Sequence, residues 1–127
     1  MPDLITEELL DALAQEESRG RMVGGDRHLT NKAYGTFQIR LPAYQDVVQR
    51  RPKYADIPFE QVQTNPETNR TFAQAYLDVL QRDYGMNTID QLLAAYNAGP
   101  TAVRQQRIPD STLRYILRIK SRLGASQ

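Results

Sequence analysis

The chain has 127 residues, and its 16 lysines and arginines nearly balance its 15 aspartates and glutamates, so the formal net charge is +1. This length fits one domain that can bury a core of its own, and the near-neutral charge does not favour a nucleic-acid-binding protein. Because the sequence has no cysteine and a single histidine, disulfides and thiolate metal sites are excluded, and we expect chemistry based on carboxylates, amides and hydroxyls, without a metal or other cofactor.

Helix signals dominate the sequence in chain order. Apolar residues recur at helical spacing over residues 3–19, where Thr6 can cap the helix and Gly20 can end it. A glycine-containing loop is predicted for residues 21–33, and a short strand or irregular segment for residues 34–39. The rest of the chain indicates helices at 42–51, 66–84, 89–98, 100–106 and 110–123, with a proline-containing connector at 53–65. We therefore expect a mainly α protein with at most a short β segment.

An acidic side chain falls on the apolar face of the first predicted helix. At about 100° per residue, Glu17 lies about 80° round the helix from Leu9, within an apolar face that centres about 50° from Leu9. Burial would disfavour the charged form of such a carboxyl and raise its pKa, and a glutamate that holds a proton near neutral pH can act as a general acid. On periodicity alone, an exposed glutamate at a frayed helix end is the simpler interpretation.

A second notable stretch is AAYNAGP at residues 94–100. Glycine and proline are sufficient to end a helix, so the helix end alone does not explain the neighbouring Tyr96 and Asn97. A tyrosine can stack on the apolar side of a sugar ring, and an amide can bind sugar hydroxyl or N-acetyl groups. Taken by itself, a core tyrosine followed by a helix-capping asparagine is the simpler interpretation.

Three segments in this order resemble the lysozyme-like superfamily, in its branch of soluble lytic transglycosylases and goose-type lysozymes. They are Glu17-Ser18 at a helix end, Tyr34-Gly35-Thr36-Phe37-Gln38-Ile39, which is similar to the family's Gly-Leu-Met-Gln segment, and Ala95-Tyr96-Asn97-Ala98-Gly99, which is similar to its Ala-Tyr-Asn segment. Weaker similarities are the helix around 65–85 and Tyr115 in the last helix. Each short motif is weak alone, but five in the family's order are fairly specific. The resemblance implies a small, mainly α, lysozyme-like catalytic domain with a sugar-binding cleft, spanning residues 1–127.

The resemblance also implies roles for the matching residues. Glu17 matches the catalytic acid/base, and the substrate-binding positions are matched by Ser18, Gly35, Phe37, Gln38, Tyr96, Asn97 and Tyr115. A glycine at position 35 would let the backbone approach the ligand closely, and Phe37 stands where the family usually has methionine. Two positions depart from the family. The pair Ser111-Thr112 replaces a Glu-Thr pair, so an acid that often supports the cleft is missing, and Arg40 stands where an apolar residue is common.

The implied substrate is the β-1,4-linked MurNAc–GlcNAc strand of peptidoglycan, and two chemistries are open. In a lytic transglycosylase one glutamate, here Glu17, protonates the glycosidic oxygen and then helps the sugar's own 6-hydroxyl attack the anomeric carbon, which gives a 1,6-anhydro end. An inverting hydrolytic muramidase, or lysozyme, needs a second carboxylate to activate water, and Asp26 in the Gly-Gly-Asp loop is the candidate. Because one clear acid is sufficient for the first chemistry, the sequence favours the transglycosylase.

Two other classes of function stay open from the sequence. A non-catalytic cell-wall-binding module would keep the cleft without the activity, although the retained Glu17 argues against it. A helical nucleic-acid-binding domain could use the basic C-terminal part of the chain. In the last predicted helix, Arg114, Arg118 and Arg122 recur every fourth residue, and such a stripe could attract anionic groups of the cell wall or outer envelope. That pattern is also typical of an ordinary amphipathic helix, and no recognition motif accompanies it. We expect a monomer that binds glycan strands and no nucleic acid.

The sequence further suggests a biological setting. It has no apolar run long enough to span a membrane, and from its first twenty residues we expect no signal peptide. A single lysozyme-like domain of this kind resembles a bacteriophage endolysin or a virion-associated lysin. Such a protein is made in the host cytoplasm and acts on periplasmic peptidoglycan after holin release or as part of a virion. A bacterial enzyme is the alternative.

Overall fold

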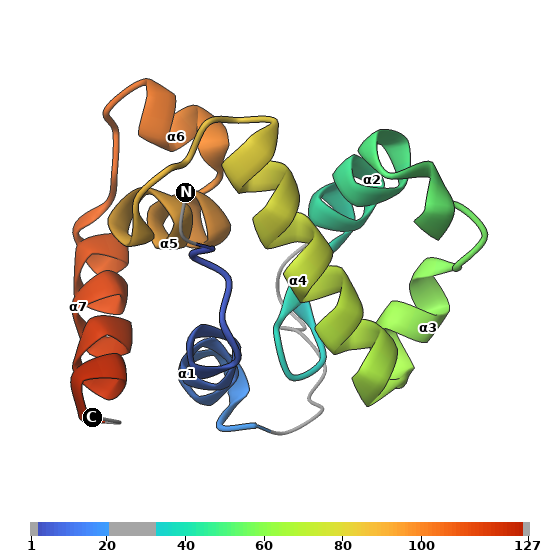
Figure 1. The fold of residues 1–127 in the computed structure, drawn as a ribbon, viewed down its shortest axis with the longest axis horizontal. Helices are drawn as coiled ribbons and strands as arrows, with labels where there is room; N and C mark the ends of the chain where they lie inside the picture. The colour runs from blue at the N-terminus through green and yellow to red at the C-terminus, as the bar shows by residue number, and fades with distance from the viewer. Residues whose placement is uncertain (1–2, 21–32, 126–127) are drawn as a thin grey trace.

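The computed structural model describes residues 3–20 and 33–125 (Figure 1). Within this part of the chain most residues are helical, and the strands form one two-stranded antiparallel sheet. The helices are α1 (Glu7–Ser18), α2 (Leu41–Arg50), the 3-10 helix η1 (Pro52–Tyr54), α3 (Phe59–Thr64), α4 (Pro66–Arg82), α5 (Ile89–Ala98), α6 (Pro100–Arg104) and α7 (Asp110–Ala125), and the strands are β1 (Ala33–Tyr34) and β2 (Ile39–Arg40). The predicted mainly α fold with a short β segment is therefore confirmed.

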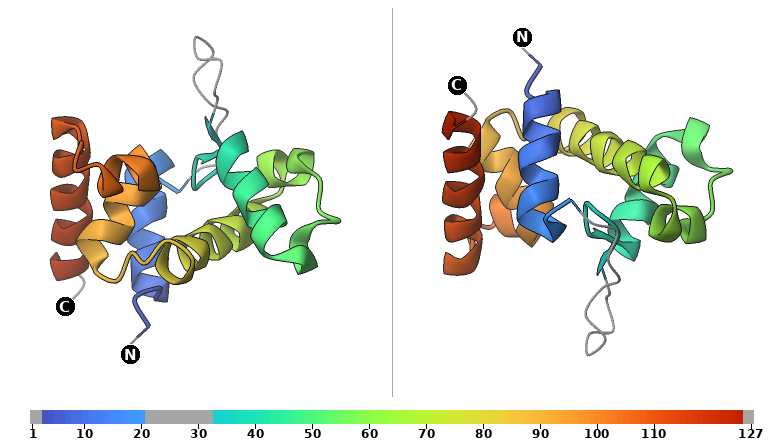
Figure 2. Two further views of the ribbon diagram at one scale, coloured as in Figure 1. Left: turned by 90° about the horizontal axis from the view of Figure 1, so that it is seen from above. Right: turned by 90° about the horizontal axis from the view of Figure 1, so that it is seen from below.

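Helix α4 runs through the molecule and connects two groups of helices (Figures 1 and 2). Helices α1, α5 and α7 pack together at one end, whereas α2 and α3 pack on the other part of α4. One hydrophobic core joins the two groups, and its fully buried side chains include Leu13, Phe72, Leu80, Leu93 and Ile119. This packing brings the C-terminal ends of α1 and α5 close to the hairpin. No helix in the described part of the chain is long and apolar enough to cross a membrane.

A polar cap and two left-handed residues set the ends of α1. Thr6 has extended backbone, with φ −107° and ψ 165°, and its side-chain oxygen accepts a hydrogen bond from the amide of Leu9 at 3.1 Å. This cap satisfies an amide that has no partner within the helix, so α1 begins directly after Thr6 and later than apolar spacing predicted. Arg19 and Gly20 have φ values of 58° and 78°, which end the helix at the predicted place.

The predicted connector at 53–65 is partly wrong, because α3 forms inside it. Pro58 precedes the helix with extended backbone, and Val62 is fully buried in the core. The helix has only six residues, which is too short for apolar spacing to reveal it in the sequence. Asn65 then caps α4 by accepting a hydrogen bond from the amide of Thr68 at 3.0 Å, so the two helices are joined through that capping residue.

The segment that the sequence left open between strand and irregular structure is a hairpin. Ala33 pairs with Arg40 and Tyr34 pairs with Ile39 in the antiparallel register. The turn at residues 35–38 contains two residues with positive φ, at its first and last positions. Neighbouring side chains of a strand point to opposite faces. Because Ile39 is buried in the core, Arg40 points away from that core.

Candidate active site

Glu17, in the last turn of α1, has a largely buried carboxyl group. Its Oε1 accepts a hydrogen bond from the hydroxyl of Tyr115 at 2.9 Å. Burial raises the pKa of Glu17 from 4.5 to about 7, and the negative charge of Glu16 adds to this rise, whereas the Tyr115 bond and the positive charge of Arg40 lower the pKa. Near neutral pH the carboxyl is therefore populated in both its protonated and its ionised form. This is what a group needs if it first donates a proton and later accepts one.

Tyr115 reaches Glu17 from α7, which packs directly on α1. The tyrosine is 4 % exposed, and burial raises the pKa of its hydroxyl well above the usual 10. The hydroxyl therefore keeps its proton and remains a hydrogen-bond donor over the whole range in which Glu17 titrates. A buried donor of this kind fixes the position of the carboxyl group as well as stabilising its ionised form.

Glu16, the neighbour of the predicted acid, has a different environment. Its carboxylate lies 2.7 Å from Nε of Arg118 and 3.6 Å from Nε of Arg122, both on α7. The side chain is 11 % exposed. These three residues form an ion-pair cluster that holds the end of α1 against α7. Glu16 is thus paired with two guanidinium groups, whereas the adjacent Glu17 accepts a hydrogen bond from the neutral hydroxyl of Tyr115.

Ser18 joins the end of α1 to the hairpin turn. Its hydroxyl donates a hydrogen bond to the carbonyl oxygen of Thr36 at 2.6 Å, and the carbonyl oxygen of Ala14 lies 3.3 Å away. The residue is 8 % exposed. Ser18 therefore positions the turn beside the acid, through a contact within the protein.

The close backbone approach at Gly35 is made to a side chain of the protein itself. A Cβ atom at this position would lie 2.2 Å from Nδ2 of Asn69, and φ is +79°. Asn69, on α4, is fully buried. Its Oδ1 accepts a hydrogen bond from the amide of Phe37 at 2.8 Å, and its Nδ2 donates to the carbonyl of Val62 at 2.9 Å. Glycine at position 35 is thus required by the asparagine that supports the turn.

Tyr96 connects the same turn to the end of α5. Its hydroxyl donates a hydrogen bond to the carbonyl oxygen of Phe37 at 2.7 Å, and the residue is 8 % exposed. The Phe37 side chain is 2 % exposed and belongs to the core, so Phe37 serves the site mainly through its backbone. Gln38 follows with a φ of 53°, and its Nε2 donates to the carbonyl of Gly35 at 2.7 Å. Left-handed backbone is uncommon at a residue other than glycine, and Gln38 combines it with a place in the lining of the cleft.

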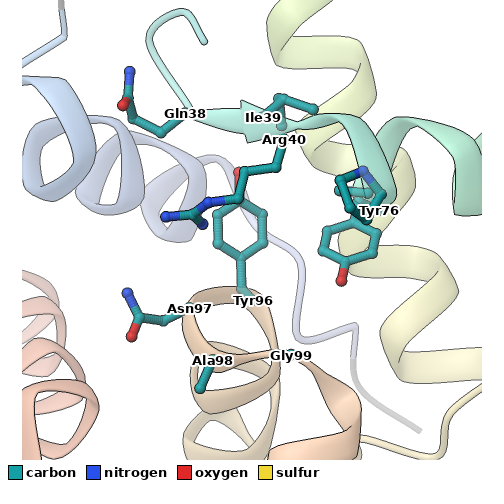
Figure 3. Close-up of a pocket in the computed structure, with 10 residues that line it drawn as sticks. Gln38, Ile39, Arg40, Tyr76, Tyr96, Asn97, Ala98 and Gly99 are labelled. Atoms are coloured by element: carbon teal, nitrogen blue, oxygen red, sulfur yellow. The ribbon is translucent and has the colours of Figure 1, made fainter. Parts of the chain in front are cut away.

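The amide of Asn97 is oriented by a threonine on α7. The hydroxyl of Thr112, which is 1 % exposed, donates to Oδ1 of Asn97 at 2.6 Å. In Figure 3 the nitrogen of the Asn97 amide points towards the side of the cleft that carries Gln38, and its oxygen points away. A ligand acceptor in the cleft would therefore meet the NH₂ group of Asn97.

These residues border a cleft of about 270 Å³ between the hairpin and the end of α5. Its lining residues are Gln38, Ile39, Arg40, Pro42, Ala43, Tyr76, Tyr96, Asn97, Ala98 and Gly99. Figure 3 shows the side chain of Arg40 extending into the space between Gln38 and Asn97, beside the ring of Tyr96. Glu17 interacts electrostatically with both Arg40 and Tyr96, which places the acid next to this cleft.

The structure therefore gathers most of the predicted site residues into one region. Gln38, Tyr96 and Asn97 line the cleft, and the remaining described ones, Glu17, Ser18, Gly35, Phe37 and Tyr115, lie in its supporting walls. Asp26, the candidate second carboxylate, lies outside the described residues. Among the residues that are described, no cluster of histidine, aspartate and glutamate side chains could hold a metal ion.

The supporting residue Asn69 was not among the site residues predicted from the sequence. Its signal was available, because Asn69 stands three positions before Phe72 and seven before Tyr76 in α4, on the apolar stripe of that helix. A polar residue on such a stripe must find hydrogen-bond partners inside the protein. Thr112 could have been found in the same way, since it lies three positions before Tyr115 on the buried face of α7.

Comparison with known proteins identifies the family of the chain. Searches of curated proteins and of solved structures found no match. The family model described as the transglycosylase SLT domain matches residues 3–117, from the start of the described chain to beyond Tyr115. The match covers the last turn of α1, the hairpin and the end of α5, which carry the proposed acid and the cleft. The chain therefore belongs to the transglycosylase SLT domain family, within the lysozyme-like superfamily.

Proposed function

We propose that this protein cleaves the β-1,4 bond between MurNAc and GlcNAc in peptidoglycan by lytic transglycosylation, with Glu17 as its single catalytic carboxylate. Family membership supports peptidoglycan as the substrate class. The observation that carries the proposal is the environment of Glu17, whose buried carboxyl lies beside the cleft and has a pKa raised to about 7. A carboxylic acid with this pKa is suited to donate a proton to a leaving group at neutral pH.

In the first step, protonated Glu17 gives its proton to the glycosidic oxygen, and the bond between that oxygen and the anomeric carbon of MurNAc breaks. The GlcNAc unit leaves with a new hydroxyl group, and positive charge develops at the anomeric centre. The carboxylate that remains accepts the hydrogen bond of Tyr115 at 2.9 Å. This bond stabilises the ionised form at the stage of the reaction where it is produced.

In the second step, the carboxylate of Glu17 takes the proton from the 6-hydroxyl of the same MurNAc. The 6-oxygen then forms a bond to the anomeric carbon, which gives the 1,6-anhydro ring and restores protonated Glu17. No water is consumed. Gln38 and Asn97 line the cleft, where their side chains can hold the N-acetyl and hydroxyl groups of the sugars in place.

The environment of the neighbouring carboxylate supports the use of one acid. An inverting hydrolase needs a second carboxylate on the opposite face of the sugar, about 6.5–9.5 Å from the first. Glu16 lies next to Glu17 at the same end of α1 and is paired with Arg118 and Arg122. It is therefore not positioned to activate a water on the opposite face of the sugar. Asp26 is the residue that hydrolysis would require.

Mass spectrometry of the muropeptides released from purified peptidoglycan tests the proposal. We expect ends of the 1,6-anhydro type, lighter by one water than reducing ends. Glu17→Gln should lower the release at least about 100-fold, because an amide cannot donate and accept the proton, while circular dichroism shows a folded protein. Reducing ends would contradict transglycosylation and indicate a lysozyme that uses Asp26. A folded wild-type protein that releases no soluble product would instead indicate a cell-wall-binding module.

A further inference from the structure

Arg40 introduces a positive charge into the cleft. It is the last residue of β2 and the residue immediately before α2. Its side chain lines the cleft together with Gln38, Tyr96 and Asn97, and Figure 3 shows it extending between the two amide side chains. The guanidinium is close enough to Glu17 to lower the pKa of that carboxyl.

Within the described part of the chain, the guanidinium of Arg40 makes no ion pair and no side-chain hydrogen bond, although it acts on Glu17 at longer range. Arg50 and Arg51, at the other end of α2, are by contrast paired with aspartates at 2.6–3.4 Å. Arg40 is only partly exposed, and withdrawing a guanidinium from water is unfavourable unless an acceptor replaces the water. The acceptor must therefore be expected from the ligand.

Glu17 cannot provide this acceptor throughout the reaction. The carboxyl must be protonated when the glycosidic bond breaks, and its neutral form would not neutralise Arg40. The N-acetyl and hydroxyl groups of the sugar are neutral and can be bound by Gln38 and Asn97. A guanidinium instead binds carboxylates through two parallel hydrogen bonds, which makes it selective for that group.

We propose that Arg40 is a specificity-determining residue that binds a carboxylate of the glycan strand. This inference rests on the proposed function and adds the chemical group that the cleft selects. Two sources of a carboxylate occur on such a strand. One is the lactyl group of MurNAc, which is ionised where the peptide stem has been removed, and the other is the stem peptide itself.

The test compares two pairs of matched substrates. The first pair is stem-free glycan strands with ionised lactyl groups and the same strands after conversion of the carboxyls to methyl amides. The second pair is stem-bearing strands with free carboxyls and the same strands after the same treatment. The value of kcat/KM is measured on all four for the wild-type protein, Arg40→Met and Arg40→Lys.

We expect Arg40→Met to lose at least about tenfold more kcat/KM on a carboxylate-bearing strand than on its methyl amide, mainly through KM, because a charge-assisted bidentate contact is lost. Arg40→Lys should recover only part of the loss, since it keeps the charge without the planar fork. A selective loss on stem-free strands identifies the lactyl carboxylate, and one on stem-bearing strands identifies the stem. Arg114→Met removes the same charge from an exposed position of α7 and controls for the overall charge. It should change the ratio of kcat/KM on a carboxylate-bearing strand to kcat/KM on its methyl amide by no more than about twofold.

Equal losses on each carboxylate strand and its amide would overturn the proposal, and would show that Arg40 acts on Glu17 or on the fold. Failure of the proposed function is visible separately, because the wild-type protein would then cleave none of the four substrates. In that case calorimetry with Glu17→Gln, and with Glu17→Gln combined with Arg40→Met, measures binding of the same strands. If the variant that also carries Arg40→Met binds only the carboxylate forms more weakly than Glu17→Gln does, the role of Arg40 is supported. Equal affinities of the two variants for the carboxylate forms contradict that role.

Discussion

The carboxyl of Glu17 lies in an environment that favours its neutral form. Its pKa is about 7 in the folded protein, compared with 4.5 in an ordinary setting. The folded state therefore binds this proton more tightly than the unfolded state does. The stability that this proton contributes is fully present below pH 4.5 and is lost as the pH rises through about 7. The site thus carries a stability cost at the pH where a general acid is useful.

Glu17→Gln should remove this cost, because the amide is neutral at every pH. We predict that the variant gains up to about 3 kcal/mol in the free energy of unfolding, relative to the wild-type protein, between pH 4 and pH 8. Urea unfolding of both proteins at several pH values measures the difference. Glu8→Gln, at an exposed position of the same helix, is the control. A difference between Glu17→Gln and wild type that does not change with pH would contradict the assigned environment.

At the scale of elements, the hairpin turn is held by contacts from three helices. Ser18 on α1 binds the carbonyl of Thr36, Asn69 on α4 binds the amide of Phe37, and Tyr96 on α5 binds the carbonyl of Phe37. Each contact uses backbone atoms of the turn. The turn is therefore fixed by buried polar groups, and its own two short strands contribute little of that fixation.

Asn69→Ala should destabilise the protein by about 3 kcal/mol, because the buried amide of Phe37 and the carbonyl of Val62 lose their partner. Gly35→Ala should also destabilise it, since the added Cβ would meet Asn69 at 2.2 Å. In the double variant the clash is absent, so adding Gly35→Ala to Asn69→Ala should cost only the strain of alanine at positive φ, about 1 kcal/mol. Chemical unfolding of the four proteins measures this cycle. Strictly additive losses would show that the two residues do not interact.

The ion-pair cluster of Glu16, Arg118 and Arg122 holds α1 and α7 together. It connects the helix that carries the acid with the helix that carries Tyr115. The stripe of arginines in the sequence suggested either attraction to a cell wall or an ordinary amphipathic helix. In the structure two of its three members bind a glutamate of the same protein, which makes this part of the stripe a helix-packing contact.

At the scale of the whole molecule, local signals predicted most of the fold. Thr6, Asn65 and Thr88 each accept a hydrogen bond from the first turn of a helix, and capping residues of this type are readable without a structure. The helix α3 was missed because six residues give too little periodicity. The pairing of the hairpin was also missed, since two-residue strands carry no alternating pattern that could fix their register.

The site was predicted in a different way. Helical periodicity placed Glu17 on an apolar face. It could not predict that Tyr115, which lies near the other end of the chain, contacts Glu17. The resemblance of ordered motifs connected these residues, and the family match confirms that resemblance. The roles of individual site residues and the phage setting stay predictions. Asn69 and the exposure of Arg40 to the cleft depend on packing between distant segments, and short sequence motifs do not report such packing.

The pKa of Glu17 in the folded protein is the property that most directly tests its assignment as the catalytic acid. Carbon NMR of protein with ¹³C-labelled glutamate side chains follows each carboxyl during a pH titration, and Glu17→Gln identifies the resonance. We predict a titration midpoint of about 7 for this carboxyl, and a fall of kcat/KM on peptidoglycan through the same pH range as the acid loses its proton. A midpoint near 4.5, or a pH profile that does not follow the Glu17 resonance, would contradict the assignment of Glu17 as the catalytic acid.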